Sequence, residues 1–234
     1  MAVEEVNAAG GILGMKVVSV ERDTKLNPAE GWYPKIGNVT AGSGISFGPG
    51  YRQTGLFGGH VDASAFAAAS FKQYWMLEGR LQLPRLAAER VVLDLHAQRY
   101  DFPEQDFFGL GPESLRQNDV VYGLKNTVLG VSSAYTPVRW LSLTGTLDRL
   151  DPRISAPLAD GSIRQRFSDV EAPGLDVQPA FVRYGAAVEV NHREPRGNPR
   201  RGGRYTLRYQ VYDDIELNQF SFDRVDVDLQ HYVP

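Results

Sequence analysis

The sequence has 234 residues, of which 42% are hydrophobic and 23% are charged, with a mean hydropathy of −0.31. The longest stretch without Asp, Glu, Lys or Arg covers residues 36–51 and contains five glycines and a proline, so no segment resembles a membrane-spanning helix. A net charge of −3 gives no electrostatic reason to expect a nucleic-acid partner, and the absence of cysteine excludes disulfides and thiolate metal sites.

The first 30 residues differ in pattern from the rest of the chain. Apolar residues lie near helical spacing in an acidic stretch, Gly10-Gly11 breaks this pattern, and residues 15–20 read as a short strand. A secretory signal is not predicted, because acidic residues stand near the N-terminus in place of a basic region and an apolar core. We expect residues 1–30 to be a segment of α/β character that is foreign or mis-joined to the remainder.

From about residue 43 onward the dominant periodicity is two. Alternation of apolar and polar residues is typical of strands with one apolar and one polar face, and we predict about nine of them. Six segments alternate clearly and three weaker candidates fill the gaps. The clear segments are 75–83, 91–98, 141–148, 182–191, 205–212 and 225–233, and the weaker ones are 43–52, 61–70 and 119–136.

Strand length and loop length both favour a membrane barrel. Most predicted strands have roughly 10 to 14 residues, longer than the usual mode of about 5 to 6, whereas a strand tilted through a bilayer needs about 9 to 11. Outer-membrane barrels have short turns on one side and longer loops on the other. Short connections are expected at 84–89, Pro137 and 193–203, and long loops at 102–118 and 150–178, with the tip 213–219 on the long-loop side.

A soluble β-sandwich or a lipocalin-like barrel would also alternate, because one face of each strand is buried. In a soluble barrel the apolar face lies inside, whereas in a membrane barrel it faces lipid and the inside is polar. We favour an all-β, antiparallel, up-and-down transmembrane β-barrel, incomplete, for residues 31–234. Charges of both signs on the opposite face suit a polar lumen, and would equally suit a solvated outer face: Glu78, Arg80, Asp94, His96, Arg183, Glu189, Arg208, Asp226, Asp228 and His231.

Four motifs, taken in order, resemble a known family. The first runs from Trp32 to Asn38 and is followed by glycine-rich residues up to Arg52. The others are the loop 106–114 (DFFGLGPES), the turn 195–205 (PRGNPRRGGRY) and the final residues 230–234 (QHYVP). Together they resemble the N-terminal part of the barrel of the BamA/TamA-like bacterial surface antigen family, over about residues 31–234.

The resemblance implies a fold and a role. Members of this family close a sixteen-stranded barrel, and a late loop carries an Arg-Gly-Phe/Tyr signature that has no counterpart here, so we expect the chain to be about the first half of a barrel. The implied role is to insert or secrete outer-membrane proteins through a seam between the first and last strands, to which a client strand adds. Because the last strand is lacking, we do not expect this mechanism to operate in the chain alone.

Residues 2–26 are similar to a short piece near the start of periplasmic branched-chain amino-acid binding proteins. Only about 25 residues match, so the similarity implies no ligand site. We expect a fusion, a gene-model error or a synthetic join at this point.

No catalytic, cofactor-binding or metal-ligating residue is predicted. The histidines lack the close spacing of zinc sites, and the sequence pattern defines no serine–histidine pair. An arginine cluster could contact phosphate or anionic lipid, although a solvated turn is the simpler interpretation, and residues 107–111 could fold over the barrel rim or form part of an aromatic girdle. The histidines are His60, His96, His192 and His231, and the arginines are Arg196, Arg200, Arg201 and Arg204.

These observations predict a protein of the bacterial outer membrane that is not an enzyme and uses no cofactor. Its expected partners are outer-membrane lipid and client outer-membrane proteins, with no nucleic acid. A soluble periplasmic ligand-binding module is the main alternative, and a membrane enzyme is a further one.

Overall fold

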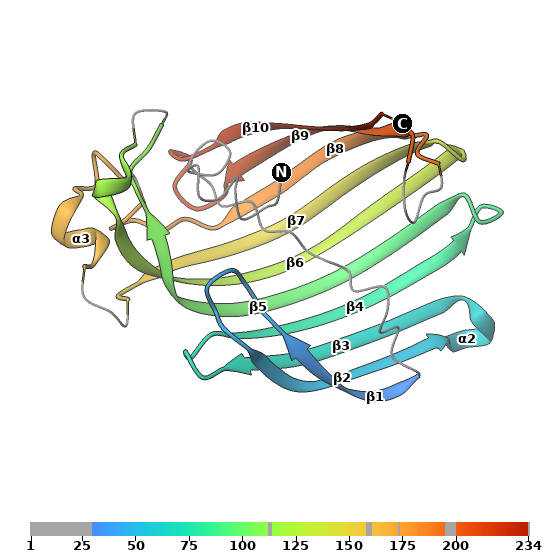
Figure 1. The fold of residues 1–234 in the computed structure, drawn as a ribbon, viewed down its shortest axis with the longest axis horizontal. Coiled ribbons are helices and arrows are strands. Elements are labelled where there is room, and N and C mark those ends of the chain that lie inside the picture. The colour runs from blue at the N-terminus through green and yellow to red at the C-terminus, as the bar shows by residue number, and fades with distance from the viewer. Residues whose placement is uncertain (1–29, 112–113, 158–160, 173, 195–199, 234) are drawn as a thin grey trace.

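Ten antiparallel strands form one up-and-down sheet in which each strand pairs with its neighbours in the chain (Figure 1). The computed structural model describes residues 30–111, 114–157, 161–172, 174–194 and 200–233. The elements are β1 (Gly31–Gly37), β2 (Ser46–Gly55), α2 (Leu56–Gly59), β3 (Val61–Ser70), β4 (Trp75–Leu86), β5 (Val91–Phe107), η1 (Arg116–Asn118), β6 (Val120–Val138), β7 (Leu141–Ser155), α3 (Ile163–Arg166), β8 (Phe181–Asn191), β9 (Gly202–Asp214) and β10 (Phe222–Tyr232).

The predicted all-β, antiparallel, up-and-down class is confirmed, but the predicted number of nine strands is wrong. The additional strand is β1, which has seven residues and includes Pro34. Pro34 lies directly opposite Pro49 of β2, so neither residue has an N–H group to donate at this pair. A strand this short and proline-containing gives too little alternation to be recognised from sequence.

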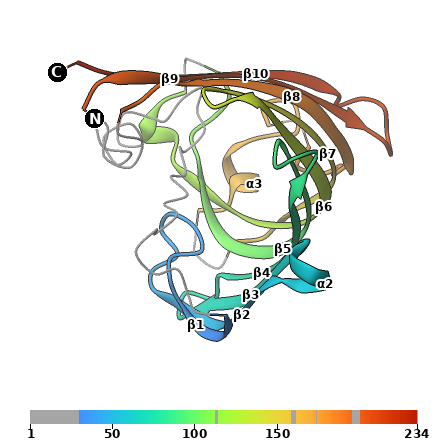
Figure 2. The same ribbon diagram turned by 90° about the vertical axis from the view of Figure 1, so that its right-hand side faces the viewer.

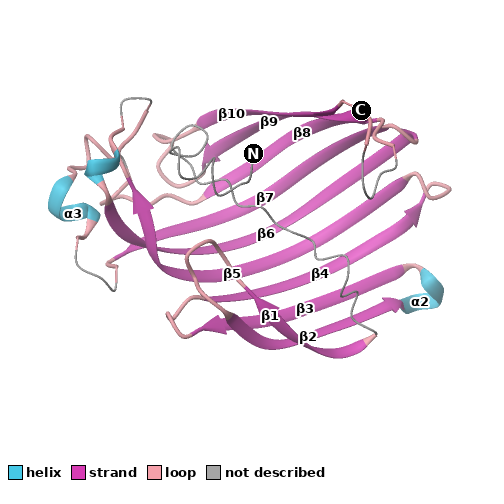
Figure 3. Ribbon diagram, viewed as in Figure 1, coloured by secondary structure: helices cyan, strands magenta, loops and turns pink. Residues whose placement is uncertain are grey.

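The predicted short N-terminal segment, residues 1–30, falls outside the described residues apart from Glu30. Its α/β character and its similarity to a binding protein therefore stay predictions. In the described parts of the chain, no helix is long and apolar enough to cross a membrane. Helix is confined to short segments at the ends of the sheet (Figure 3).

Three register shifts interrupt the sheet, and each contains a proline. Pro84 lies at the shift between β4 and β5, Pro103 at that between β5 and β6, and Pro137 at that between β6 and β7. Because proline cannot donate to the ladder, it is tolerated within a sheet chiefly at such irregularities. The short connection predicted at Pro137 lies two residues later, because β6 continues to Val138 and residues 139–140 join it to β7.

Several strands are longer than the alternation predicted. The predicted loops 102–118 and 150–178 are wrong at their starts, because β5 continues to Phe107 and β7 to Ser155. At these ends the outer face carries charges, including Asp106, Asp151 and Arg153, while Phe107 and Ile154 lie on the inner face. The polarity of the two faces is therefore no longer that of the strand centre, so the alternation that identifies a strand is lost there although the ladder continues.

The connections differ in length between the two ends of the sheet, as predicted. The two longest connections share one end with the β9–β10 loop, and tight turns predominate at the other. The first end carries residues 38–45, 71–74, 108–119, 156–180 and 215–221, and the second carries 56–60, 87–90, 139–140 and 192–201.

The two faces of the curved sheet have opposite chemistry. Ile163 of α3 packs against Val120 of β6, and α3 projects inside the curve of the sheet when the molecule is viewed roughly along its strands (Figure 2). The face of Val120 is therefore the inner face, and it also carries the buried Asp148. The outer face carries exposed leucines and valines, including Leu129 at 63% and Val227 at 61% exposure. This is the reverse of the lipocalin-like alternative, which required an apolar inside.

The sheet is open. Among the described strands, β1 pairs only with β2 and β10 only with β9. Each edge therefore presents backbone N–H and C=O groups along one side.

The β9–β10 loop is organised by one carboxylate at the end of β9. Asp214 Oδ1 accepts the backbone N–H groups of Glu216 and Leu217 at 3.0 and 2.9 Å, and Oδ2 accepts those of Gln219 and Phe220 at 3.1 and 3.3 Å. Burial by itself raises the pKa of Asp214, but these four donors lower it more strongly, from an ordinary 3.8 to about 2.

This loop is predicted to open in acid. Because the folded pKa lies below the unfolded value, the contribution of Asp214 is fully present above about pH 3.8 and is lost as the pH falls through about 2. Pepsin cleavage within residues 215–221 should therefore accelerate as the pH falls towards 2. The Asp214→Asn variant should be cleaved several-fold faster than the parent at pH 4, whereas Asp228→Asn, an exposed position on β10, should behave like the parent. Equal cleavage of the Asp214 variant and the parent at pH 4 would contradict this role.

Candidate functional site

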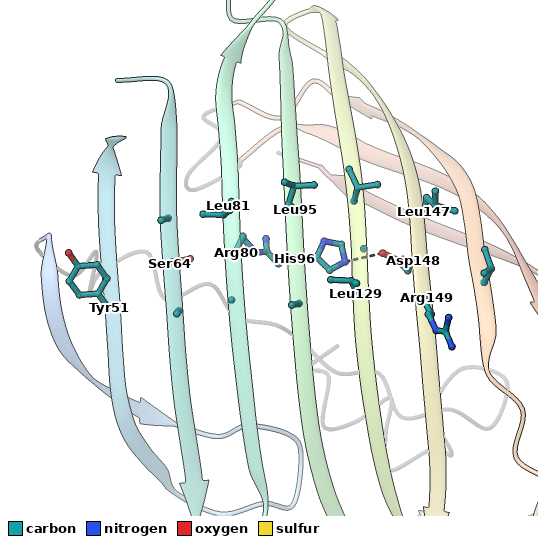
Figure 4. Close-up of a pocket in the computed structure, with 17 residues that line it drawn as sticks. Tyr51, Ser64, Arg80, Leu81, Leu95, His96, Leu129, Leu147, Asp148 and Arg149 are labelled. Carbon is teal, nitrogen blue, oxygen red and sulfur yellow. Dashed lines mark ion pairs between the residues drawn. The ribbon is translucent and has the colours of Figure 1, made fainter. Parts of the chain in front are cut away.

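A row of directly paired residues crosses the middle of the inner face. Arg80 on β4 pairs with His96 on β5, which pairs with Gly130 on β6. Gly130 pairs with Asp148 on β7, which pairs with Arg183 on β8. Directly opposed residues have Cβ atoms about 4.5–5.5 Å apart, so long side chains in this row can meet. Figure 4 shows His96 and Asp148 meeting across β6.

Asp148 is the most deeply buried charge of this row. Its side chain is only 1% exposed. Arg183 donates to Asp148 Oδ2 through Nε at 2.8 Å and Nη2 at 2.5 Å. His96 Nε2 lies 2.9 Å from the other oxygen, Oδ1. A carboxylate withdrawn from water is costly unless it is paired, and here each oxygen faces a nitrogen.

His96 lies between two carboxylates. Its Nδ1 is 3.1 Å from Asp94 Oδ1, and its Nε2 faces Asp148. The Nδ1 contact has hydrogen-bond geometry, whereas the Nε2 contact is a close approach of ring nitrogen to carboxylate oxygen without hydrogen-bond geometry. His96 thus links β5 to β7, although β6 lies between these strands.

Gly130 makes this link possible. A Cβ atom at Gly130 would lie 1.8 Å from Asp148 Oδ1 and 2.8 Å from His96 Nε2. These distances are shorter than any van der Waals contact, so a larger residue would displace the two side chains. The glycine therefore permits the two side chains to meet over the backbone of β6.

Asp94 extends the network towards β4. Gln82 Nε2 donates to Asp94 Oδ2 at 2.8 Å, and Arg80 Nη1 lies 3.5 Å from the same oxygen. Arg80 also approaches Glu78, with Nε 3.8 Å from Oε1. The network joins four strands by charge-assisted contacts, which are stronger than neutral hydrogen bonds.

The long loops fold over the inner face at one end of the sheet. Buried residues of the 161–180 segment pack on strand residues that share the inner face with Asp148. Phe107 and Phe167 meet edge to face with ring centroids 5.1 Å apart. The strand residues are Phe107, Val120, Tyr122 and Ile154, and the loop residues are Ile163, Phe167, Ala172 and Leu175.

Polar contacts hold this loop cluster to the strands. The Gln178 side chain accepts from Ile154 N at 2.7 Å and donates to Ile154 O at 3.1 Å, as a neighbouring strand would. Arg166 Nη1 donates to Gln117 O at 3.1 Å, which ties the second long loop to the first. The two loops therefore form one structural unit over the mouth of the sheet.

The histidines considered in the sequence lie apart. His96 belongs to the inner network, whereas His231 Nδ1 lies 2.7 Å from Tyr205 Oη, and the His192 ring lies beside the other side of the same tyrosine. His60 lies between α2 and β3, at the same end of the sheet as His192 and His231 but on distant strands. In the described part of the chain, no group of three His, Cys, Asp or Glu residues is suited to a metal ion.

The arginine cluster is partly paired. Arg201 Nη2 lies 2.7 Å from Glu194 Oε2, and Arg204 Nε lies 2.9 Å from Glu189 Oε2. Arg200 is exposed, and Arg196 lies outside the described residues.

The interpretation of residues 107–111 as part of an outward aromatic girdle is wrong for Phe107. Its ring packs inside, in the loop cluster, so the alternative of a loop folding over the rim fits the structure.

Sequence reasoning missed the network around Asp148. It placed Asp94, His96 and Arg183 on the polar face but did not bring them together with Asp148. Their meeting depends on the register of four strands, which periodicity does not reveal. The available signal was Gly130, a lone glycine on the polar face of a strand.

Comparison with known proteins supports the fold. No family model matches the sequence, and no curated protein sequence matches it. Among solved structures, the chain is similar to the crystal structure of BamA from Haemophilus ducreyi lacking POTRA domains 1–3, with a TM-score of 0.61 and 13% sequence identity. The match covers 87% of this chain and 36% of that chain, so this chain spans about a third of the BamA structure. The fold is thus that of an outer-membrane-type β-barrel.

The role of Gly130 can be tested by adding a single methyl group. Gly130→Ala should lower the free energy of unfolding by about 1–3 kcal/mol, because the contact between His96 and Asp148 has to open. Urea titration of tryptophan fluorescence, in detergent micelles or lipid vesicles, measures the change. Gly145→Ala is the matched control, since a Cβ atom there meets nothing within 4 Å. Equal stability of the two variants would argue against the network.

Proposed function

We propose that this chain forms part of a β-barrel in the bacterial outer membrane, with its outer face in lipid. The observation that carries the proposal is the inversion of the sheet: leucines and valines are exposed outside, while charged residues are buried inside. Exposing so large an apolar surface to water is unfavourable, whereas contact with the hydrocarbon of a bilayer is favourable. The likeness of the fold to BamA supports the same location.

The alternatives receive no comparable support. Paired charges occupy the centre of the inner face, where a soluble barrel would hold an apolar ligand cavity. Within the described residues, no serine or threonine hydroxyl contacts His96, so its neighbours provide no nucleophile of the kind used by serine hydrolases.

We further propose that the barrel takes part in the assembly or translocation of outer-membrane proteins. The motifs that resemble the BamA/TamA-like family and the likeness to the BamA fold support this role. The β1 edge has suitable properties, since β1 is the shortest strand and its pairing with β2 includes two opposed prolines. A client strand could add to such an edge through backbone hydrogen bonds.

The membrane location predicts opposite outcomes for two adjacent residues of β7. Leu147 faces outward and is 51% exposed, whereas Thr146 faces the inside. In vesicles, Leu147→Arg should lower the free energy of unfolding by more than about 1 kcal/mol, because an arginine on the lipid face costs about 2–4 kcal/mol at the midplane and about 0–1 kcal/mol near the interface. Thr146→Arg should cost much less, since the inner face is polar. Urea titration of the chain in phosphatidylcholine vesicles measures both.

A soluble protein would behave differently. An exposed Leu→Arg change in water usually stays within about 0.5 kcal/mol. A monomer that folds in plain buffer and tolerates Leu147→Arg would therefore contradict the membrane proposal.

The assembly role predicts selective pairing at β1. The chain has no cysteine, so single cysteines can be placed at Ile36 on β1 or at Leu207 on β9, both exposed outer-face positions. A barrel strand from a client outer-membrane protein that carries one cysteine should form a disulfide with Ile36→Cys. Leu207→Cys should react little, because β9 is paired on both sides. Equal reaction at the two positions would argue against strand addition.

A further inference from the structure

The outer face carries an open hollow across the middle of the sheet, lined by residues of the strands from β2 to β8. The hollow has a volume of about 970 Å³ and is lined almost entirely by apolar atoms. Its floor includes Ala65 and Gly79, which lie side by side on paired strands, and its walls include Leu81, Leu95 and Leu129 (Figure 4).

Two arginines stand on the same outer face at the border of this hollow. Arg149 lines it, and its side chain extends towards the long-loop end of the sheet (Figure 4). Arg99 lies two residues beyond Ala97, another residue of the lining, also on the long-loop side. Both side chains are exposed, and among the described residues neither makes a hydrogen bond or an ion pair.

Two pairs of opposite charge lie on this part of the outer face. Lys125 Nζ lies 3.1 Å from Asp101 Oδ2, and Arg153 Nη2 lies 2.6 Å from Asp151 Oδ1. These two pairs compensate each other. Asp213 on β9, level with Arg149, adds one negative charge, so Arg99 and Arg149 leave the border of the hollow with a net positive charge.

The spacing of the two arginines suits a headgroup with two phosphates. They lie on β5 and β7, two inter-strand steps or roughly 10 Å apart across the sheet, and Arg99 is offset from Arg149 by two residues, roughly 7 Å, along the strands. Guanidinium groups recognise phosphate through paired, charge-assisted hydrogen bonds. In outer-membrane barrels the longer loops are extracellular, so this border lies at the outer leaflet if the proposed membrane location is correct.

We propose that the hollow and the two arginines bind a bisphosphorylated, multiply acylated glycolipid of the outer leaflet. An acyl chain occupies the hollow, and the phosphates contact Arg99 and Arg149. This inference rests on the proposed membrane location and adds the chemical class of the lipid.

The test uses the full chain in phosphatidylcholine vesicles with a fluorescent bisphosphorylated lipid A as the probe. Energy transfer from the protein's tryptophans to the lipid reports binding. The double variant Arg99→Gln/Arg149→Gln should bind at least tenfold more weakly than the parent. Dephosphorylated lipid A should bind the parent as weakly as the bisphosphorylated lipid binds the double variant. Arg208→Gln is the matched control, since Arg208 is exposed and lies on the inner face.

A second variant tests the hollow without changing charge. A Cβ atom at Gly79 meets nothing within 4 Å, so Gly79→Leu fills the hollow without a clash at that atom. It should weaken binding severalfold, and circular dichroism checks that each variant folds.

The outcomes separate the two proposals. Flotation with phosphatidylcholine vesicles is measured first, and failure to float overturns the membrane location and this inference with it. Flotation together with equal lipid A binding by the parent and the double variant, or equal binding of the phosphorylated and dephosphorylated lipids, overturns this inference alone.

Discussion

Register is the constraint on which the rest of this structure depends. Side chains alternate between the faces of each strand, so a slip of one residue would turn a whole strand's apolar set inward and its charges outward. The contacts of Asp148 oppose such a slip, because it meets Arg183 on the next strand and His96 on the strand beyond β6. A displaced β7 would leave a carboxylate buried without partners, which is strongly unfavourable.

The same contacts explain how a polar interior is held together. A conventional core of packed apolar side chains is scarce in the described structure, and its main cluster lies under the long loops. Along the strands, hydrogen bonds and ion pairs on the inner face take over this function. Such pairs contribute more when they are shielded from water, as Asp148 is, than at an exposed position.

The sequence predicted the strands where alternation was uninterrupted. Residues 61–70 match β3, since their outward alanines alternate with mainly polar or larger residues. Periodicity failed at β1, which is short and contains Pro34, and at the ends of β5 and β7, where the outer face becomes charged and the inner face carries apolar residues. It also placed His96 and Arg183 on the correct face. It could not predict that both contact Asp148, because contacts between strands can be inferred only when the register is known.

The folded loops have a mechanical consequence for the sheet. They attach to β5, β6 and β7, which are also the three longest strands. These strands are therefore stabilised in two ways. Their long ladders supply many backbone hydrogen bonds, and the packed aromatic and aliphatic residues of the loop cluster hold them together at one end. The short strands at the margins, above all β1, have neither support. Bending of the sheet should thus concentrate at the strands near its two edges, while β5, β6 and β7 move as one rigid unit together with the loop cluster.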